Sequence, residues 1–247
     1  MGKYQVSVII PVYNGEKYLS KAIESVLRQE ILCEIVIVND CSTDGTENVI
    51  QGYSHLEQVR YLKNERNKGV AYSRNRGVEA STGEYIAFLD ADDWWEDTKL
   101  KKQLQALKGS GAVLCSTARE LFDENGKSIG KIIPVPKVIN YKRLLHHNCI
   151  ACSSVIMKRE IALEFPQEYD KAHEDYIMWL KILKKYPMAL GINEPLLKYR
   201  LSSAGKSGSK LKSAKMTYQV YRYIGCGQIQ AAAYFVLYAI HGVIKYI

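Results

Sequence analysis

The chain has 247 residues, 47% hydrophobic and 24% charged, a composition that excludes a disordered protein and allows one α/β domain or one domain with an appendage. The net charge of +8 is unevenly placed: residues 1–194 hold equal numbers of basic and acidic side chains, whereas residues 195–247 hold eight basic and no acidic ones. A basic segment of this kind attracts an anionic surface, either nucleic acid or the acidic lipids of a membrane.

The amino-terminal segment lacks the pattern of a secretion signal. Its apolar stretch, Val6 to Ile10, is only five residues long before Pro11, and no small-residue cleavage pattern follows it. A signal sequence needs an apolar region of roughly 7–15 residues. We therefore expect a cytoplasmic protein.

Strands and helices alternate over the first 110 residues. Apolar runs predict strands, and apolar side chains at helical spacing predict helices. The expected strands are Val6–Ile10, Glu34–Val38, Val59–Leu62 and Tyr85–Leu89, and the expected helices are Leu19–Leu27, 45–53, Gly69–Ala80 and Lys99–Leu107. Because the strands show no polar alternation, we predict an α/β fold with a mostly parallel central sheet and helices on both faces.

Polar residues follow three of these strands directly. They lie in Pro11–Asn14, Asn39–Asp40 and Asp90–Asp93. In open α/β sheets, ligands bind beyond the carboxyl ends of the strands. We therefore predict that the three groups meet in one crevice.

The pattern changes after residue 110, where we expect the second half of the same domain on the acceptor side. The expected elements are strands at Ala112–Ser116 and Ile150–Met157, a hairpin around Asp123–Gly126, a helix Asp175–Lys185 opening at His173, and two further helices near 210–223 and 228–245. The predicted units are a catalytic domain over 1–205 and a basic, amphipathic helical tail over 206–247.

The six cysteines are scattered, which in a cytoplasmic protein indicates free thiols. Cys149 and Cys152 have the spacing of half a zinc site or of a redox pair. No second CxxC or HxxxH completes a tetrahedral ligand set. We therefore expect buried structural cysteines, since free cysteine commonly lies in protein cores.

Three carboxylates lie close together after the fourth strand, at Asp90, Asp92 and Asp93. The chain has no GxGxxG after the first strand and no GxxxxGK[ST], so its crevice lacks the usual glycine-rich phosphate sites. A divalent cation held by carboxylates is another way to bind a diphosphate. In extended backbone, Asp90 and Asp92 point the same way. The alternative is an acidic cap for the helix that starts at Lys99.

The ordered series PVYN, VND with CSTDGT, NKGVAYSRNRG, DADD and HED resembles the inverting glycosyltransferases of family 2, which have the GT-A (Rossmann-like) fold and use nucleotide-diphosphate sugars. The resemblance covers most of residues 5–205. It implies that UDP-sugar contacts come from Pro11, Tyr13, Asn14, Asp40, Arg74, Asp90 and Ala91. In particular, it places Tyr13 against the base and gives Asp40 a hydrogen bond from the imide N–H of uracil. Asp40 as a cap of the next helix is the alternative.

The same resemblance implies the reaction groups. Asp92 would ligate Mn²⁺ or Mg²⁺ on the diphosphate, and the cation would stabilise the departing UDP. Asp175 would be the general base that deprotonates the acceptor hydroxyl, giving inversion at the anomeric carbon. Alternatively, Asp175 and its neighbour only complement the helix dipole. The candidate acceptor or lid residues are Trp94, Trp95, Glu174, Trp179 and Arg200, although each tryptophan fits the core equally well.

The tail suggests where the reaction takes place. Basic and aromatic side chains in 210–223 and an apolar segment at 231–247 favour helices on a membrane surface, with docking on the core as the alternative. A lipid-linked saccharide acceptor would follow, with a soluble one as the other option. The chain resembles the β1,3-glucosyl/galactosyltransferases that build O-antigen at the cytoplasmic face of the inner membrane.

The sequence also allows two other functional classes. A sugar nucleotidyltransferase would use the same metal carboxylates, but it normally needs a glycine-rich, basic loop after the first strand. A nucleic-acid-binding protein would use the basic tail, with an affinity that falls steeply with salt. We expect no nucleic-acid partner.

Overall fold

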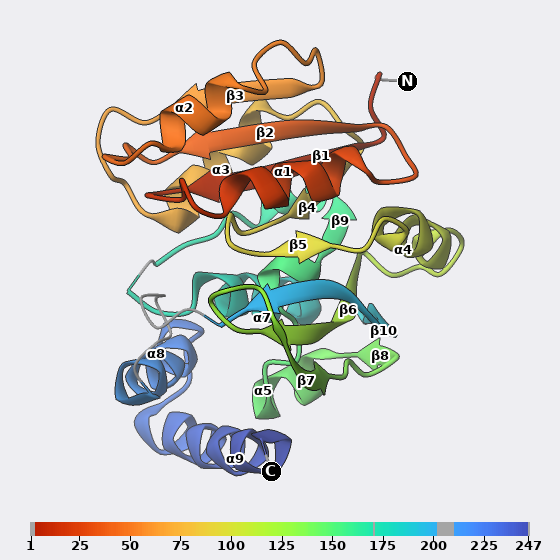
Figure 1. Ribbon diagram of the computed structural model, residues 1–247. Helices are drawn as coiled ribbons and strands as arrows, with labels where there is room; N and C mark the ends of the chain where they lie inside the picture. The colour runs from red at the N-terminus through yellow and green to blue at the C-terminus, as the bar shows by residue number, and fades with distance from the viewer. Residues whose placement is uncertain (1–2, 170, 202–209, 247) are drawn as a thin grey trace.

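A computed structural model describes residues 3–169, 171–201 and 210–246 (Figure 1). Its centre is a ten-stranded mixed sheet in the order β3-β2-β1-β4-β9-β6-β10-β5, with β7 paired to β6 and β8 paired to β10. The amino-terminal strands β1 (Val6–Val12), β2 (Cys33–Asn39), β3 (Val59–Lys63) and β4 (Tyr85–Phe88) run parallel. The parallel sheet expected from the apolar runs is therefore confirmed for this half.

Helices cover both faces of the parallel strands, as the sequence predicts. Alternate side chains of β2 enter different cores, because successive residues of a strand point to opposite faces. Val36 and Val38 belong to the core cluster that contains Val78, whereas Ile35 and Ile37 belong to the cluster that contains Leu100. The first 110 residues contain α1 (Leu19–Leu27), α2 (Thr46–Gln51), α3 (Val70–Ala80) and α4 (Lys99–Leu107).

The carboxyl-terminal half of the sheet is built around a long parallel pair. Its strands are β5 (Trp94–Trp95), β6 (Leu114–Phe122), β7 (Ser128–Ile133), β8 (Val138–Ile139), β9 (Ile156–Lys158) and β10 (Ala189–Arg200). Strands β6 and β7 form the expected hairpin, and β10 runs parallel to β6. Strand β9 is antiparallel to both β4 and β6 and so joins the two halves.

The strand predicted over Ile150–Met157 is wrong for most of its length. Cys152–Ser154 form a 3-10 turn, and only Ile156–Lys158 pairs in the sheet. The apolar character of this segment comes from burial and not from strand pairing, because Ile150 and Val155 are also fully enclosed. A short apolar run does not distinguish these cases.

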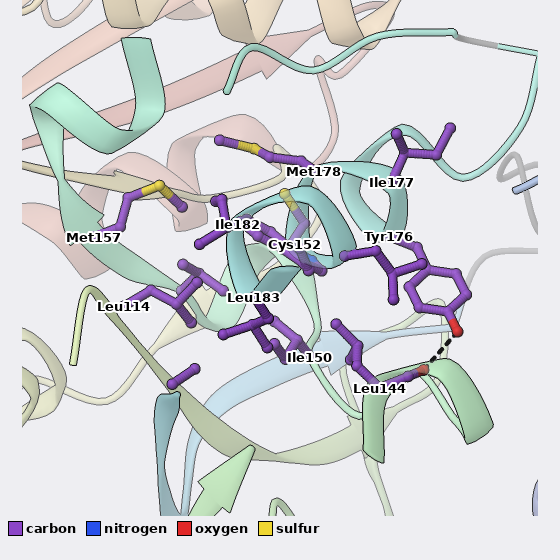
Figure 2. Packing of buried hydrophobic residues seen from close by; sticks show 14 of the residues in the cluster. Leu114, Leu144, Ile150, Cys152, Met157, Tyr176, Ile177, Met178, Ile182 and Leu183 are labelled. Atoms are coloured by element: carbon purple, nitrogen blue, oxygen red, sulfur yellow. Dashed lines mark hydrogen bonds between the residues drawn. The ribbon is translucent and has the colours of Figure 1, made fainter. Parts of the chain in front are cut away.

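Helix α7 (Glu174–Lys185) is the central helix of the second core, as Figure 2 shows. Its apolar residues Ile177, Ile182 and Leu183 pack among side chains of the sheet and of the helix α5 (Tyr141–His146). The hydroxyl of Tyr176 donates a hydrogen bond to the carbonyl oxygen of Leu144 over 2.6 Å. The amino-terminal end of α7 is thereby fixed. A further short helix, α6 (Arg159–Glu164), packs near α3.

The expectation of buried structural cysteines is confirmed at Cys149 and Cys152, which are 8% and 7% exposed. All six cysteines are free thiols. Within the described ranges, no group of three or more His, Cys, Asp or Glu side chains has an arrangement that would hold a metal ion. A zinc site at these cysteines is therefore not supported.

The chain ends in α8 (Lys210–Tyr223) and α9 (Gln228–Tyr246), close to the two predicted helices. Helix α8 packs on the core through Val220 and Tyr221, and α9 does so through Ala231. A search of the described residues finds no helix with the length and apolarity needed to cross a membrane. The predicted domain boundary between residues 205 and 206 lies outside the described ranges.

Candidate active site

The carboxyl ends of β1, β2 and β4 bring the three predicted polar groups to one edge of the sheet. The last residues of β1 and β2, Val12 and Asn39, are partners in register, and the amide of Asp40 donates to the carbonyl of Val12 over 2.8 Å. A Cβ atom on Gly15 would lie 3.6 Å from Cβ of Ala91. The loops after β1 and β4 are therefore in contact.

The loop after β1 is bonded to the loop after β2. Asn14, which has a φ of +52°, accepts hydrogen bonds through its side-chain oxygen from the amide (2.8 Å) and hydroxyl (3.3 Å) of Thr43. Pro11 is buried within β1, whereas the Tyr13 side chain is 50% exposed. Asn14 thus shapes the loop, and Tyr13 is the residue available to a base.

The carboxylate of Asp40 is held by three donors. One oxygen accepts from the side-chain amide of Asn64 (2.7 Å) and the backbone amide of Lys68 (2.8 Å), and the other accepts from the amide of Gly69 (2.8 Å). The helix α2 has no side-chain cap. Capping of α2 by Asp40 is therefore not observed, and the carboxylate instead organises the loop before α3.

Arg74 lies at the centre of the site and links the loop after β4 to the start of α7. Its guanidinium donates to Asp90 (2.5 Å), Glu174 (3.0 Å) and the side chain of Gln167 (2.9 Å). The Arg74 side chain is only 4% exposed. Burial on its own would lower the pKa of Arg74, but Asp90 and Glu174 raise this pKa well above its usual value. The Arg74 guanidinium is bonded to protein carboxylates, and its contact with the nucleotide stays a prediction.

The acidic loop after β4 combines one buried carboxylate, that of Asp93, with two partly exposed ones, those of Asp90 and Asp92. Asp90 is 32% exposed at its side chain. Burial and the charge of Asp90 raise the pKa of Asp92 to about 6. Asp93 is almost fully buried, and burial together with its two acidic neighbours raises its pKa well above the usual value. Burial and close like charges both disfavour the ionised form of a carboxyl group.

The alternative of an acidic helix cap is not observed for these residues. Helix α4 follows Thr98, has no side-chain cap and has no acid in its first turn. Asp97 forms an ion pair with Arg28 over 3.2 Å. Asp90 and Asp92 are therefore not engaged with α4.

Asp175 lies in the first turn of α7, next to the ion pair of Glu174 with Arg74. It is half-buried, and one carboxylate oxygen accepts from the amide of Tyr176 over 2.8 Å. Burial and the neighbouring Glu174 raise the pKa of Asp175, while His173 and Arg74 act in the opposite direction. A carboxylate with a raised pKa is a better proton acceptor.

Two of the three candidate tryptophans belong to the core. Trp179 is fully enclosed, and Trp95 is 1% exposed and donates from its ring nitrogen to the carbonyl of Ser153 over 2.7 Å. Neither ring has a free face for a sugar in this structure, which agrees with the core alternative. Trp94 is 8% exposed, with Lys21 3.4 Å from its ring centroid. The expectation of acceptor contacts is corrected for Trp95 and Trp179.

Arg200, at the end of β10, is built into the acidic loop. Its Nε donates to the backbone carbonyl of Asp92 and its amide donates to the carboxylate of Asp93, both over 2.9 Å. The guanidinium also lies 4.3 Å from the ring centroid of Tyr18. Arg200 thus fixes this loop.

The site as a whole has an excess of negative charge. Five carboxylates, those of Asp90, Asp92, Asp93, Glu174 and Asp175, are gathered around the guanidinium groups of Arg74 and Arg200. Among the described residues, the carboxylate of Asp92 forms no ion pair. Its hard oxygen atoms are the ligand type that Mg²⁺ and Mn²⁺ prefer, so Asp92 fits a divalent cation.

The sheet order, the parallel strands and the polar edge agree with the predicted GT-A fold. A family model described as "Glycosyl transferase family 2" matches residues 7–164, and the chain therefore belongs to glycosyl transferase family 2. The match covers strands β1 to β9, including the loops that carry Asp40 and the acidic residues.

Relatives of known name agree with this family. TuaG of Bacillus subtilis, provisionally named a teichuronic acid biosynthesis glycosyltransferase, is 37% identical over 97% of this chain and 96% of its own length. WfgD of Escherichia coli is 34% identical over 89% of this chain and 86% of its own. Its name describes a UDP-Glc:α-D-GlcNAc-diphosphoundecaprenol β-1,3-glucosyltransferase. The chain thus spans nearly the full length of both relatives.

The fold is also similar to a solved structure. The mannosyltransferase PcManGT from Pyrobaculum calidifontis, in complex with GDP-Man and Mn²⁺, superimposes with a TM-score of 0.71 at 18% identity. The similarity covers 94% of this chain and 69% of that one. At this identity the likeness concerns the fold, and it confirms the predicted GT-A class.

Proposed function

We propose that this glycosyltransferase moves a hexose from a UDP-sugar to a saccharide hydroxyl with inversion at the anomeric carbon. One observation carries the proposal: Arg74 bonds both Asp90, on the acidic loop, and Glu174, next to Asp175. The donor-side carboxylates and the helix that carries the candidate base are therefore held together by one buried guanidinium. This arrangement suits a displacement in which the base and the leaving group lie on opposite sides of the sugar.

The donor side favours a uracil nucleotide. A carboxylate offers about four lone-pair positions, and Asp40 uses three of them for Asn64, Lys68 and Gly69. One position is left for the imide N–H of uracil, a donor that cytosine does not offer. The half-exposed ring of Tyr13 would stack on the base. The name of the relative WfgD, which includes UDP-Glc, agrees with this choice of nucleotide.

Asp92, with Asp90 beside it, would hold Mn²⁺ or Mg²⁺ together with the diphosphate. Such cations commonly take only one or two carboxylates when phosphates supply other ligands. A site with only one or two protein carboxylates is consistent with the finding that, within the described ranges, no three His, Cys, Asp or Glu side chains form a metal site. The Mn²⁺ present in the PcManGT complex supports the choice of ion. When bound, the cation would neutralise charge on the departing UDP.

Asp175 would accept the proton of the attacking hydroxyl. Its pKa is raised by burial and by Glu174, which strengthens it as a base, while Arg74 keeps Glu174 paired. A single displacement converts an α-linked donor into a β-linked product. Glu174 is in this account a positioning residue, since its carboxylate is bonded to Arg74 and not to a substrate.

The acceptor is proposed to be a lipid-linked saccharide used for surface polysaccharide. WfgD is named for transfer to a GlcNAc-diphosphoundecaprenol, and TuaG is provisionally named for teichuronic acid biosynthesis. An enzyme of this kind would work as a peripheral protein at the cytoplasmic face of the membrane. A soluble saccharide acceptor is the alternative. Comparing the transfer rates to a lipid-linked acceptor and to a soluble one distinguishes the two.

A thermal-shift panel of nucleotide sugars tests the donor proposal. UDP-hexoses are expected to raise the melting temperature of the wild-type protein in the presence of Mn²⁺, with a much smaller effect on Asp92→Ala. GDP- and CDP-sugars serve as matched controls. A larger shift with either control nucleotide, or no shift with any UDP-sugar, would contradict the proposal.

A further inference from the structure

Helix α9 has two apolar faces with different surroundings. The inner face packs on the protein: Ala231 is fully buried, and the ring centroid of Tyr234 lies 5.6 Å from that of Tyr221. The ring of Tyr238 lies 5.6 Å from that of His147 on the segment after α5. These contacts hold α9 against the core as a firmly packed element.

The outer face of α9 is aliphatic and exposed. Its large side chains are Ile229, Val236, Leu237 and Ile240, which are 89%, 55%, 38% and 51% exposed. At about 100° per residue these four positions lie within roughly 100° of one another around the helix, and they extend along about 17 Å of it. Single exposed apolar side chains are ordinary, but a continuous stripe indicates an interaction surface. We refer to these four residues as the α9 stripe.

Basic side chains lie on the two helices that contact α9. Helix α5 presents Lys142 and Arg143, and α8 presents Lys215 and Arg222, all of them exposed. In Figure 1, α8 and α9 lie side by side at one end of the molecule, with α5 beside them. The sequence holds no acid between residues 125 and 159 or after 195. Among the described residues, α5, α8 and α9 therefore carry basic side chains and no acidic ones.

A hollow of about 520 Å³ next to this surface is lined in part by Lys142, Arg143 and His146. The ring of His146 also lies 6.2 Å from that of Tyr234 on α9. His146 therefore both lines the hollow and contacts α9. Its cationic walls suit a phosphate-bearing head group.

We propose that the α9 stripe and the basic side chains of α5 and α8 form a docking surface for an anionic lipid bilayer. Aliphatic side chains can enter the boundary between head groups and acyl chains, while lysine and arginine pair with lipid phosphates. A second copy of the chain fits less well, because a two-fold contact would bring identical cationic surroundings together. Nucleic acid would use the cations but not the aliphatic stripe. Membrane binding and docking on the core, which the sequence offered as alternatives, would then be compatible, because one face of α9 packs on the core and the other would face lipid.

The docking surface is connected to the proposed base. His173 lies two residues before Asp175, and its ring nitrogen contacts the carbonyl oxygen of Ser213 in α8 over 3.3 Å. A bilayer bound by α8 and α9 would thus lie on an element that touches the start of α7. A lipid-linked acceptor in that bilayer would lie near Asp175, a statement that rests on the proposed function.

Flotation of the full chain with vesicles tests the proposal. The wild-type protein is expected to bind phosphatidylcholine vesicles that contain phosphatidylglycerol, and to bind pure phosphatidylcholine at least tenfold more weakly. Val236→Glu should weaken binding to anionic vesicles at least tenfold. Leu32→Glu is the matched control, because Leu32 is also 55% exposed but lies between α1 and β2. The double variant Lys142→Glu, Arg143→Glu should bind anionic vesicles more weakly than the wild type does. Its binding to pure phosphatidylcholine vesicles should be unchanged.

Three outcomes would overturn the proposal: no binding of the wild type to anionic vesicles, equal losses in Val236→Glu and Leu32→Glu, or a lipid-free dimer that Val236→Glu dissociates. Light scattering after size-exclusion chromatography shows whether the protein forms such a dimer. UDP binding, measured in the same samples, separates the two levels of inference. If the wild-type protein binds UDP but not vesicles, only the proposal of a docking surface is refuted. If the wild-type protein does not bind UDP, the proposed function is refuted.

Discussion

Replacement of Arg74 by methionine is expected to lower the free energy of unfolding by about 3–5 kcal/mol, the usual cost of breaking a buried ion pair from one side. Methionine keeps much of the volume but none of the charge. Arg74 is 4% exposed and bonds Asp90 over 2.5 Å and Glu174 over 3.0 Å. Glu174 is itself only 7% exposed at its side chain, so its carboxylate would stay buried after losing its ion pair with Arg74. This loss is large against a typical total stability of about 5–15 kcal/mol.

Urea unfolding followed by the fluorescence of the buried tryptophans measures the loss. Arg28→Met is the matched control, because Arg28 pairs with Asp97 over 3.2 Å while both side chains are about half exposed. Such a surface pair is worth at most about 1 kcal/mol. Adding Glu174→Gln to Arg74→Met should restore at least about 1 kcal/mol by removing the buried charge that Arg74 balanced. A loss no larger than that of Arg28→Met, or no recovery in the double variant, would refute the reasoning.

Three other predictions concern the base, the cation and a buried lysine. Asp175→Asn should keep UDP-sugar binding in calorimetry and lose about 10²- to 10⁴-fold in transfer; near-normal turnover would exclude Asp175 as the base. Chelation of divalent cations should weaken UDP binding to the wild type and have little effect on Asp92→Ala, so equal sensitivity would exclude the metal role. Lys99 is fully buried, and burial lowers its pKa from 10.5 to about 7. Between those values the unfolded chain carries a proton that the folded protein lacks, so stability should rise with pH, by about 2 kcal/mol from pH 7 to pH 9 relative to Lys99→Met. Parallel urea-unfolding curves for the two proteins across this range would contradict the assignment.

The amino-terminal half was predictable because its signals are local. The first four strands are short apolar runs, and β1 and β2 are buried along their full length. The acidic loop, the turn before α2 and the start of α7 could likewise be located from neighbouring residues. The carboxyl ends of parallel strands share one edge of a sheet, so the meeting of these loops followed from the strand pattern alone.

Strand β10 could not be predicted in the same way. Its residues Ala189–Arg200 include Glu194 and Pro195, and two of them, Asn193 and Glu194, are exposed. Its pairing with β6 also shifts register between Ile192 and Leu197. A strand with this irregularity lacks both the alternation and the continuous apolar run on which sequence prediction depends.

The partners of the central arginine were also hidden from the sequence. Gln167 and Glu174 are 93 and 100 residues beyond Arg74 along the chain. Residue spacing gives no information on contacts this distant. The sequence therefore placed Arg74 in the site but gave no sign of its bonds to two carboxylates and a side-chain amide.

A crystal structure of the protein with UDP and Mn²⁺ would test the central proposal most directly. We predict density for uracil between Tyr13 and Asp40, for the ion beside Asp92, and a free carboxylate of Asp175 facing the end of the diphosphate. A nucleotide bound away from this edge of the sheet, or an ion bound without Asp92, would contradict the account.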